Sequence, residues 1–391
     1  MKKLFIIICM GGLLTLCGCQ LLSVEPPYEY NPPSAVPYGV DALAVDMFRH
    51  VVAQEKGNVV FSPASAEAVL LMLRDGAAGQ TRRELDALPY GKQDVTSAMQ
   101  VESANAIFAD DSLTIKPGAT SVQRVPFADN PAKAVDIVNA WCSEKTHGKI
   151  SAILSPLLLS KDTRLIATNA VYLKEKWLRP FMPSSTRPQE FHLSNGSTVR
   201  VPMMHQEANL LYAKGKDWQA VALFYRRDGR KGEPGCFIGI LPKGDARAFA
   251  ATLTPQKFNA IRTALAQSGY EHTEVFLPRF EVNPPAFSLA TALQTLGVRA
   301  AFSKQAADLR NLAQTPDGTP LYLSDIVQRC YVKADEQGTK AAAVTGMAVA
   351  IQSAPIIKEP RIIRFDKPFL WVIADLSTAA PPYFMGLVET P

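Results

Sequence analysis

The sequence has few residues of the kinds that build metal sites or active sites. Its histidines form no pair at helical spacing and have no neighbouring ligand pattern; they stand at positions 50, 147, 192, 205 and 272. The sequence also contains no Gly-x-Ser-x-Gly elbow, no His-Glu-x-x-His pair and no glycine-rich phosphate loop. No motif indicates a catalytic residue, so we expect a protein that is not an enzyme and carries no metal or cofactor.

The sequence also has few cysteines and a small net charge. Cys142, Cys236 and Cys330 fit neither a disulfide framework nor a metal site by their spacing, and we expect them to pack in the core. The net charge is only +5, and no Lys/Arg run is long enough to follow a phosphate backbone, so no nucleic-acid partner is expected. Glycine and aspartate interrupt the densest basic stretch, Arg226–Gly232, and predict a solvated hairpin tip; a binding role is the alternative.

The N-terminus has the composition of an export signal. Lys2 and Lys3 precede an apolar run, residues 4–16, which is too short for a permanent membrane helix and has the length of a signal peptide. The Leu-Cys-Gly-Cys motif that ends at Cys19 resembles a bacterial lipobox, whose last cysteine is cleaved and lipid-modified. Secretion with incidental cysteines is the alternative, but the small residue before Cys19 favours lipidation.

These features divide the chain into three predicted parts. Residues 1–18 are a lipoprotein signal peptide, 19–38 a proline-rich tether, and 39–391 a folded domain. We expect an exported protein that a lipid at Cys19 anchors to the membrane. Gln20 in place of aspartate indicates the outer membrane or the cell surface, as a resemblance to other lipoproteins.

The remaining chain mixes helical and strand patterns without a repeat. The 40–51 segment has the i, i+3, i+4, i+7 stripe of an amphipathic helix, and Ser62-Pro63 begins a second, mostly apolar helix. Further helices are expected at 246–267 and 287–296, and strands at 165–172, 199–204, 220–225, 237–241, 274–282 and 369–374. Because the order has no βαβ rhythm, the pattern predicts an α+β fold with antiparallel-rich sheets.

A segment near the C-terminus is suited to changing its conformation. In Glu336–Ser353, Gly338 permits backbone angles that are closed to other residues, and small residues follow it. Period-two alternation divides the segment into two faces. One face holds Thr339, Ala341, Ala343, Thr345, Met347, Val349 and Ile351, and the other holds Lys340, Ala342, Val344, Gly346, Ala348, Ala350 and Gln352.

Short motifs elsewhere point to the same kind of protein. Asn58–Leu73 contains Phe-Ser-Pro-Ala-Ser, and Gly76–Thr81 reads Gly-Ala-Ala-Gly-Gln-Thr. Other motifs stand at 139–150, 168–177, 180–181, 201–204, 277–280, 296–298, 301–302, 368–369 and 384–386. Together with the segment 336–353, these motifs resemble, in order, those of the serpins, protease inhibitors that insert an exposed loop into their own central sheet.

The resemblance implies a fold and a mechanism. The fold is a single α+β domain with three β-sheets surrounded by about eight or nine helices, and an exposed reactive-centre loop. The function is suicide-substrate inhibition of serine endopeptidases, and of cysteine endopeptidases as a further class, through a covalent 1:1 complex formed by a monomer. The hinge is implied at Glu336, Gly338, Thr339, Ala341, Ala342 and Ala343, and a cluster under the opening sheet at Ser62, Ser65, Asn169, Trp177 and Gln328.

The scissile bond follows from the family's spacing, about sixteen residues after the hinge glutamate, which indicates Gln352-Ser353. Ala350 and Ile351 are alternates, and the aliphatic residues around them suit an elastase- or subtilisin-like protease. Lys358 and Arg361 would instead serve a trypsin-like enzyme. A non-inhibitory serpin that acts as a surface binding module is the other alternative. Lys340, where the family usually has glutamate, is a departure, but it falls on the outward face.

Overall fold

The structure, a computed structural model, describes residues 42–91, 99–119, 122–232, 234–339, 359–378 and 380–391. These residues contain seven α-helices: α1 (Ala42–Gln54), α2 (Pro63–Gly76), α3 (Gly79–Asp86), α4 (Pro131–Lys145), α5 (Ala246–Ala251), α6 (Pro255–Gln267) and α7 (Ala290–Thr295). The expected eight or nine helices are therefore too many for the described part of the chain. Three further helical segments, Pro156–Leu158, Pro183–Ser185 and Ala300–Phe302, close only one 3₁₀ turn before the backbone becomes extended.

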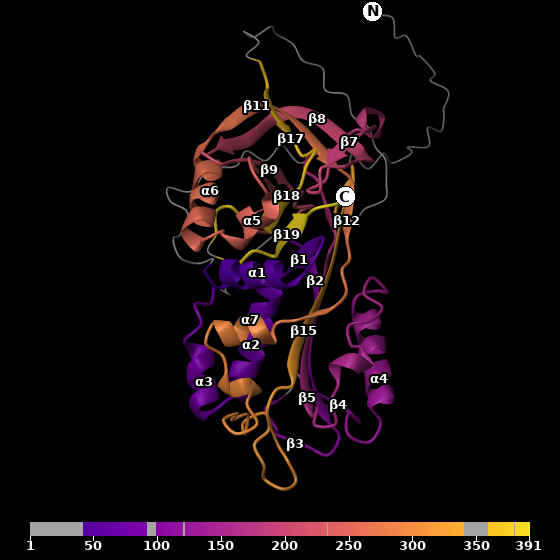
Figure 1. The fold of residues 1–391 in the computed structure, drawn as a ribbon, viewed down its shortest axis with the longest axis vertical. Helices are drawn as coiled ribbons and strands as arrows, with labels where there is room; N and C mark the ends of the chain where they lie inside the picture. The colour runs from indigo at the N-terminus through magenta and orange to yellow at the C-terminus, as the bar shows by residue number, and fades with distance from the viewer. Residues whose placement is uncertain (1–41, 92–98, 120–121, 233, 340–358, 379) are drawn as a thin grey trace, which may run out of the picture. The chain divides into compact units, whose positions relative to one another are not determined.

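Nine strands form the larger sheet. Its order is β1 (Val59–Phe61), β19 (Phe384–Val388), β18 (Phe369–Ala374), β10 (Cys236–Pro242), β9 (Trp218–Phe224), β8 (Thr198–Lys214), β11 (Tyr270–Pro278) and β17 (Arg361–Arg364), and β7 (Arg187–His192) pairs with β8. The long strand β8 joins two parts of this sheet (Figure 1). It pairs with β7 and β11 along most of its length, and with β9, which leads to β10, β18, β19 and β1, at its end.

Six strands form the second sheet, in the order β12 (Phe280–Val282), β15 (Asp325–Ala334), β5 (Leu165–Leu173), β2 (Val101–Asp110) and β4 (Val122–Val125), with β13 (Phe287–Ser288) beside β15. This sheet and the two parts of the nine-stranded sheet that β8 joins together make up the three-sheet organisation predicted from the sequence. Two short ladders complete the strands: β14 (Ala313–Gln314) with β3 (Thr114–Ile115), and β16 (Gly338–Thr339) with β6 (Glu175–Lys176).

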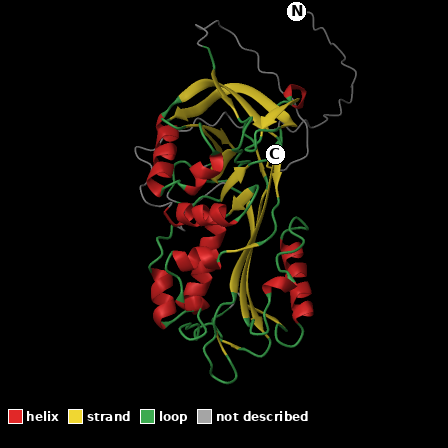
Figure 2. Ribbon diagram, in the orientation of Figure 1, coloured by secondary structure: helices red, strands yellow, loops and turns green. Residues whose placement is uncertain are grey.

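The helices pack on the sheets and on one another. Helices α1, α2, α3 and α7 contact one another in a chain, and α5 and α6 pack on strands β8, β9, β10 and β18 of the nine-stranded sheet (Figure 2). Helix α1 also contacts α5 and α6 and so joins the two groups. Helix α4 covers one face of the six-stranded sheet near β2 and β4. Its N-cap is Asn130, whose side chain accepts a 3.0 Å hydrogen bond from the Lys133 amide, and proline occupies its first turn.

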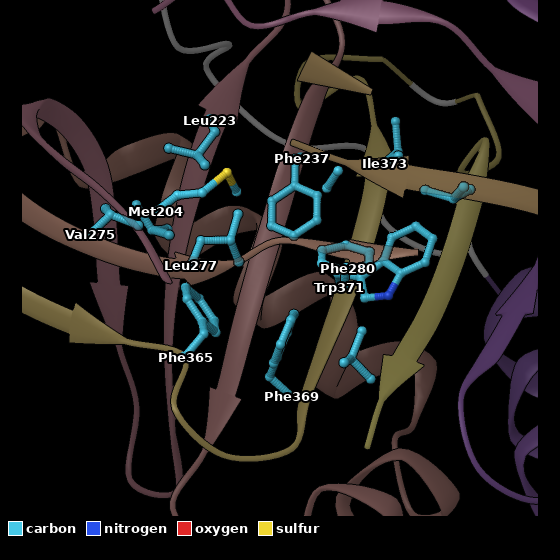
Figure 3. Close-up of a cluster of buried hydrophobic side chains, with 14 of the residues drawn as sticks. Met204, Leu223, Phe237, Val275, Leu277, Phe280, Phe365, Phe369, Trp371 and Ile373 are labelled. Atoms are coloured by element: carbon cyan, nitrogen blue, oxygen red, sulfur yellow. The ribbon is translucent and has the colours of Figure 1, made fainter. Parts of the chain in front are cut away.

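The main hydrophobic core lies between the two large sheets. An aromatic group forms its centre: Phe237 stacks on Trp371 with ring centroids 6.2 Å apart, and Phe280 and Phe369 pack edge to face beside them (Figure 3). Val171 and Cys330, from β5 and β15, close the core from the six-stranded sheet. The opposite face of these strands contributes residues such as Tyr172 and Tyr331 to a second core under α4.

Strands β5 and β15 are neighbours, and they run parallel. Their register joins Ile166 to Asp325 at one end and Tyr172 to Tyr331 at the other. All nine residues of β5 are buried, as expected for a central strand covered on both faces. A parallel pair whose strands come from segments far apart in the sequence can be separated without breaking a chain connection, and β15 leads directly to the hinge.

Candidate hinge and sheet-opening site

The described part of the hinge is already a short strand. Gly338 pairs with Lys176, and Thr339 pairs with Glu175, in an antiparallel ladder between β16 and β6. The chain reaches this ladder by a tight turn, in which the Asp335 amide donates to the Gly338 carbonyl at 3.0 Å and the Gly338 amide donates back at 3.3 Å. Thr339 is only 1% exposed, so the hinge begins inside the protein.

Glycine is required at the start of this ladder. Gly338 has a φ of +146°, in a region that side chains rarely allow, and a Cβ atom there would stand 2.1 Å from the Glu175 carbonyl oxygen. The β6 backbone therefore fits against the hinge only because residue 338 has no side chain. This agrees with the conformational role that the sequence assigns to Gly338.

Glu336 anchors the hinge on its N-terminal side. Its carboxylate, with a side chain 6% exposed, accepts hydrogen bonds from Arg279 Nε at 2.8 Å and from Thr186 Oγ1 at 2.5 Å. Its carbonyl accepts a 2.9 Å bond from the Phe181 amide. Burial opposes ionisation of Glu336, but the bonds from Arg279 and Thr186 outweigh it and hold the pKa of the carboxyl below its usual range.

Trp177 lies beneath the turn and holds it. Its indole Nε1 donates to the Asp335 carbonyl at 2.8 Å, and its backbone amide donates to the Gln337 carbonyl at 3.0 Å. The indole stacks on Tyr225 with centroids 4.8 Å apart and planes 10° apart. Tyr225 in turn shares a 3.0 Å hydrogen bond between its hydroxyl and Thr339 Oγ1. Trp177 is thus a buried support of the hinge as well as a core aromatic.

The four other predicted cluster residues meet in one buried network. Gln328 on β15 accepts a 2.9 Å bond from the Ser62 amide and donates to the Ser62 carbonyl at 3.1 Å, while its amide also contacts Asn169 on β5. Asn169 Nδ2 donates to Ser65 Oγ. Because the network crosses from β15 to β5, separating these strands must break polar bonds as well as apolar contacts.

Two residues of β2 and a buried thiol extend this network. Ser65 Oγ contacts Ser103 Oγ at 2.7 Å and donates to Asn105 Oδ1 at 3.0 Å. Cys330 Sγ lies 3.4 Å from Gln328 Oε1. The sequence did not predict Ser103 and Asn105 because β2 was not recognised as a strand. Its polar residue at 105, between alanines in a strand-like stretch, was the signal available.

A second ion pair at the hinge has no counterpart in the sequence interpretation. Arg230 donates to Glu175 through two bonds of 2.8 Å, Nη1 to Oε1 and Nη2 to Oε2, and the Glu175 side chain is 2% exposed. Arg230 belongs to the basic stretch predicted to be a solvated tip. That prediction is wrong for Arg230, because its guanidinium turns inward to a carboxylate 55 residues away. Burial raises the pKa of Glu175 above its usual range, against the lowering effect of Arg230 and of the Gln100 amide.

Several predicted site residues lie outside the described part of the chain. They are Cys19, Ala341, Ala342, Ala343, Ala350, Ile351, Gln352, Ser353 and Lys358. Arg361 is described: it opens β17, pairs in register with Thr273, and its Nε donates to Glu271 at 2.8 Å. A scissile bond at Arg361 would therefore have to leave a formed strand.

Three buried thiols remain within the described residues. Cys142, Cys236 and Cys330 are buried free thiols, and burial raises the pKa of Cys142 to about 12. No group of His, Cys, Asp or Glu side chains within the described ranges could hold a metal ion. A search of the same residues found no helix that is long and apolar enough to cross a membrane.

Comparison with known proteins decides the family. The family model described as "Serpin (serine protease inhibitor)" matches residues 39–391. The chain belongs to the serpin family. Among curated proteins, this serpin is 30% identical over 380 residues to an uncharacterized serpin-like protein of Thermococcus kodakarensis, covering 90% of this chain and 85% of that protein. It is 29% identical over 356 residues to a serine protease inhibitor of Rattus norvegicus, covering 83% of this chain and 82% of that protein.

Solved structures agree with this assignment. Serpin48 of Tenebrio molitor, described as a highly specific serpin, superimposes with a TM-score of 0.75 at 25% identity over 90% of this serpin and 97% of that chain. The thermophilic serpin tengpin in its native state has a TM-score of 0.77 at 24% identity over 93% and 98%. The second match, at its lower identity, concerns the fold alone.

Proposed function

We propose that the protein is a suicide-substrate inhibitor of serine endopeptidases, with cysteine endopeptidases as a further target class. The protease attacks the reactive-centre loop as a substrate and forms its acyl-enzyme. The cleaved loop then enters the six-stranded sheet between β5 and β15 and holds the protease in a covalent 1:1 complex with a serpin monomer. Relatives named as serine protease inhibitors, from Cyanea capillata and Rattus norvegicus, support this activity.

The observation that carries the proposal is the agreement of three strand registers. Continuing the β16–β6 ladder from Thr339 and Glu175 brings Thr345 opposite Asn169. The bridge between Asp335 and Gly338 pairs the end of β15 with β16. Continuing this antiparallel pairing back along β15 brings the same Thr345 opposite Gln328. Asn169 and Gln328 are already partners in the β5–β15 pair. One register therefore fits an inserted strand to both of its neighbours.

The same register gives the inserted side chains suitable surroundings. Ala343 comes opposite Val171 and Cys330, both of which are fully buried in the main core, so a small apolar residue is needed there. Thr345 meets the polar network at Asn169 and Gln328, where a hydroxyl can hydrogen-bond. This division into a core-facing and an outward face matches the alternation in the sequence, and it favours an inhibitory serpin over a non-inhibitory binding module.

The scissile bond in this proposal is Gln352-Ser353, with Ala350 and Ile351 as alternates, and the target is an elastase- or subtilisin-like protease. A trypsin-like target would use Lys358 or Arg361. Arg361 is held in β17 by a strand ladder and an ion pair. These contacts argue against cleavage at Arg361, because a substrate bond must extend into the protease cleft.

A panel of proteases tests the activity. We expect covalent complexes that survive boiling in detergent with an elastase-like or subtilisin-like enzyme, weaker or no complexes with a trypsin-like enzyme, and papain as the probe for the cysteine class. Cleavage of the loop by every enzyme without any such complex would instead support the non-inhibitory alternative.

We also propose that residues 1–18 are removed as a signal peptide and that Cys19 carries a lipid. The tether 19–38 then holds the serpin domain 39–391 at the outer membrane or the cell surface. Cys19→Ala should abolish incorporation of a radioactive fatty acid, and Cys17→Ala is the matched control that keeps it. Equal labelling of wild type and Cys19→Ala would disprove the anchor.

A further inference from the structure

The buried carboxylate of Glu175 joins three segments at the point where the sheet must open. Its backbone is the ladder partner of Thr339, the last described residue before the reactive-centre loop. Its two oxygens accept the bidentate pair of 2.8 Å bonds from Arg230, and Oε1 also accepts from the backbone amide of Gln100, next to β2. Bidentate arginine–carboxylate pairs are the strong and directional members of their class.

Arg230 is held in position by its own loop. This loop, residues 225–235, connects β9 to β10 in the nine-stranded sheet. Arg230 Nε donates to the Arg227 carbonyl at 2.7 Å, and Nη2 donates to the Arg226 carbonyl at 2.9 Å. The turn between them uses Asp228 and Gly229 at φ of 48° and 77°. The guanidinium therefore reaches Glu175 from a fixed hairpin rather than as a free side chain.

The same loop is also bonded to the backbone of β6. The Arg226 amide donates to the Lys176 carbonyl at 2.8 Å, and Tyr225 forms a β-bridge with Trp177. The segment that continues β5 is thus attached to the hinge by the β16–β6 ladder and to the nine-stranded sheet by this loop. Movement of β5 away from β15 at this end must therefore either carry the 225–235 loop away from the nine-stranded sheet or break the bonds between Glu175 and Arg230.

We propose that Glu175 and Arg230 form a clasp between the β16–β6 ladder, which directly follows β5, and the β9–β10 loop of the nine-stranded sheet. This clasp restrains the opening of the six-stranded sheet and so sets the rate of loop insertion. The inference rests on the proposed function, because it concerns the same insertion. Both residues are positioning residues: they touch neither the protease nor the scissile bond. The clasp delays insertion until cleavage releases the loop, and it protects the active form from spontaneous insertion.

The test compares Arg230→Met with Lys231→Met. Both changes remove one positive charge from the same loop, but Lys231 is exposed. The proteins are held at a raised, sub-denaturing temperature. Spontaneous insertion is followed by the loop's growing resistance to a non-target protease and by resistance to urea. We expect insertion about tenfold faster in Arg230→Met, which corresponds to about 1.4 kcal/mol of the pair's interaction being lost at the barrier to opening, and unchanged in Lys231→Met.

Further variants separate a clasp from a purely structural role. Glu175→Gln with Arg230→Met leaves no unpaired buried charge, and it should insert as fast as Arg230→Met alone while remaining folded. Arg230→Lys should restore part of the delay. If the uncleaved Arg230→Met protein and the uncleaved double variant both lose urea resistance but insert at the wild-type rate, the pair only stabilises the fold. That result would overturn the proposal.

The experiment also distinguishes this inference from the proposed function. If wild type never gains urea resistance, even after its loop is cleaved, insertion itself fails, and so does the proposed function. If wild type gains it and Arg230→Met matches Lys231→Met in rate, insertion stands and only the clasp is refuted.

Discussion

Replacing Ala343 by arginine should convert the inhibitor into a substrate. In the register proposed above, residue 343 of the inserted loop would lie between Val171 and Cys330, each 0% exposed in the main core. A guanidinium placed there loses its hydration without a partner, at a cost of several kcal/mol. Full insertion, with about a dozen new ladder bonds at about 0.5–1.5 kcal/mol each, gains on the order of 10 kcal/mol. Insertion therefore remains downhill, but it becomes slow.

The rate decides the outcome, because insertion competes with hydrolysis of the acyl-enzyme. If about 3 kcal/mol of the cost appears in the barrier, insertion slows by about 10²-fold, and most encounters end in release of cleaved serpin. The assay measures the ratio of detergent-stable complex to cleaved protein at increasing serpin-to-protease ratios. Lys340→Arg, on the outward face, is the control and should behave as wild type. Wild-type partitioning in Ala343→Arg would refute the register.

Two further predictions follow from charges at the hinge. In the inserted form, the proposed register brings Lys340 between Lys174 and Lys333, so Lys340→Glu should replace repulsion by attraction. We expect the free energy of unfolding of the loop-inserted form to rise by about 1 kcal/mol, measured as a higher urea midpoint. An unchanged or lower midpoint would contradict the register. Glu336 has a lowered pKa in the folded protein, so the stability it supplies is present above the ordinary glutamate pKa, about 4.3, and is lost as pH falls through the lower folded value. Glu336→Gln should therefore flatten the acid side of the urea-midpoint profile, and parallel profiles for the two proteins would show that the bond to Arg279 contributes nothing.

Strands with a strong pattern were predicted well from the sequence. Residues 369–374 form β18 with the predicted bounds, and 165–172 form all but one residue of β5, because both are continuous apolar runs of strand length. The predicted strand at 274–282 is divided into β11 and β12, which belong to different sheets. Alternation continues through both strands, and local sequence does not show that the chain changes partners at Arg279.

Helix boundaries failed for a different reason. The segment 246–267 was predicted as one helix, but it contains α5 and α6, separated by residues 252–254. Thr254 caps the second helix by accepting a 3.1 Å bond from the Lys257 amide, and Pro255 fills its first turn. This boundary could have been predicted, since a Thr-Pro pair inside an apolar period indicates a new helix start.

The candidate site shows the same division between local and long-range information. Gly338 was recognisable from its own chemistry, and Ser62, Asn169 and Gln328 from the resemblance to a family. Arg230 was not recognisable in this way, because its proposed role depends on Glu175. Only the folded 225–235 loop brings the two residues together. Polar residues that act through partners distant in the sequence carry no periodic signal, and a single sequence does not reveal them.

The most direct test of loop insertion is the intact mass of the product formed with an elastase- or subtilisin-like protease. We expect a covalent species containing the protease and the serpin without its C-terminal fragment, and a released fragment beginning at Ser353. Quantitative cleavage at that bond with only free protease and cleaved serpin in the mass spectrum would contradict it.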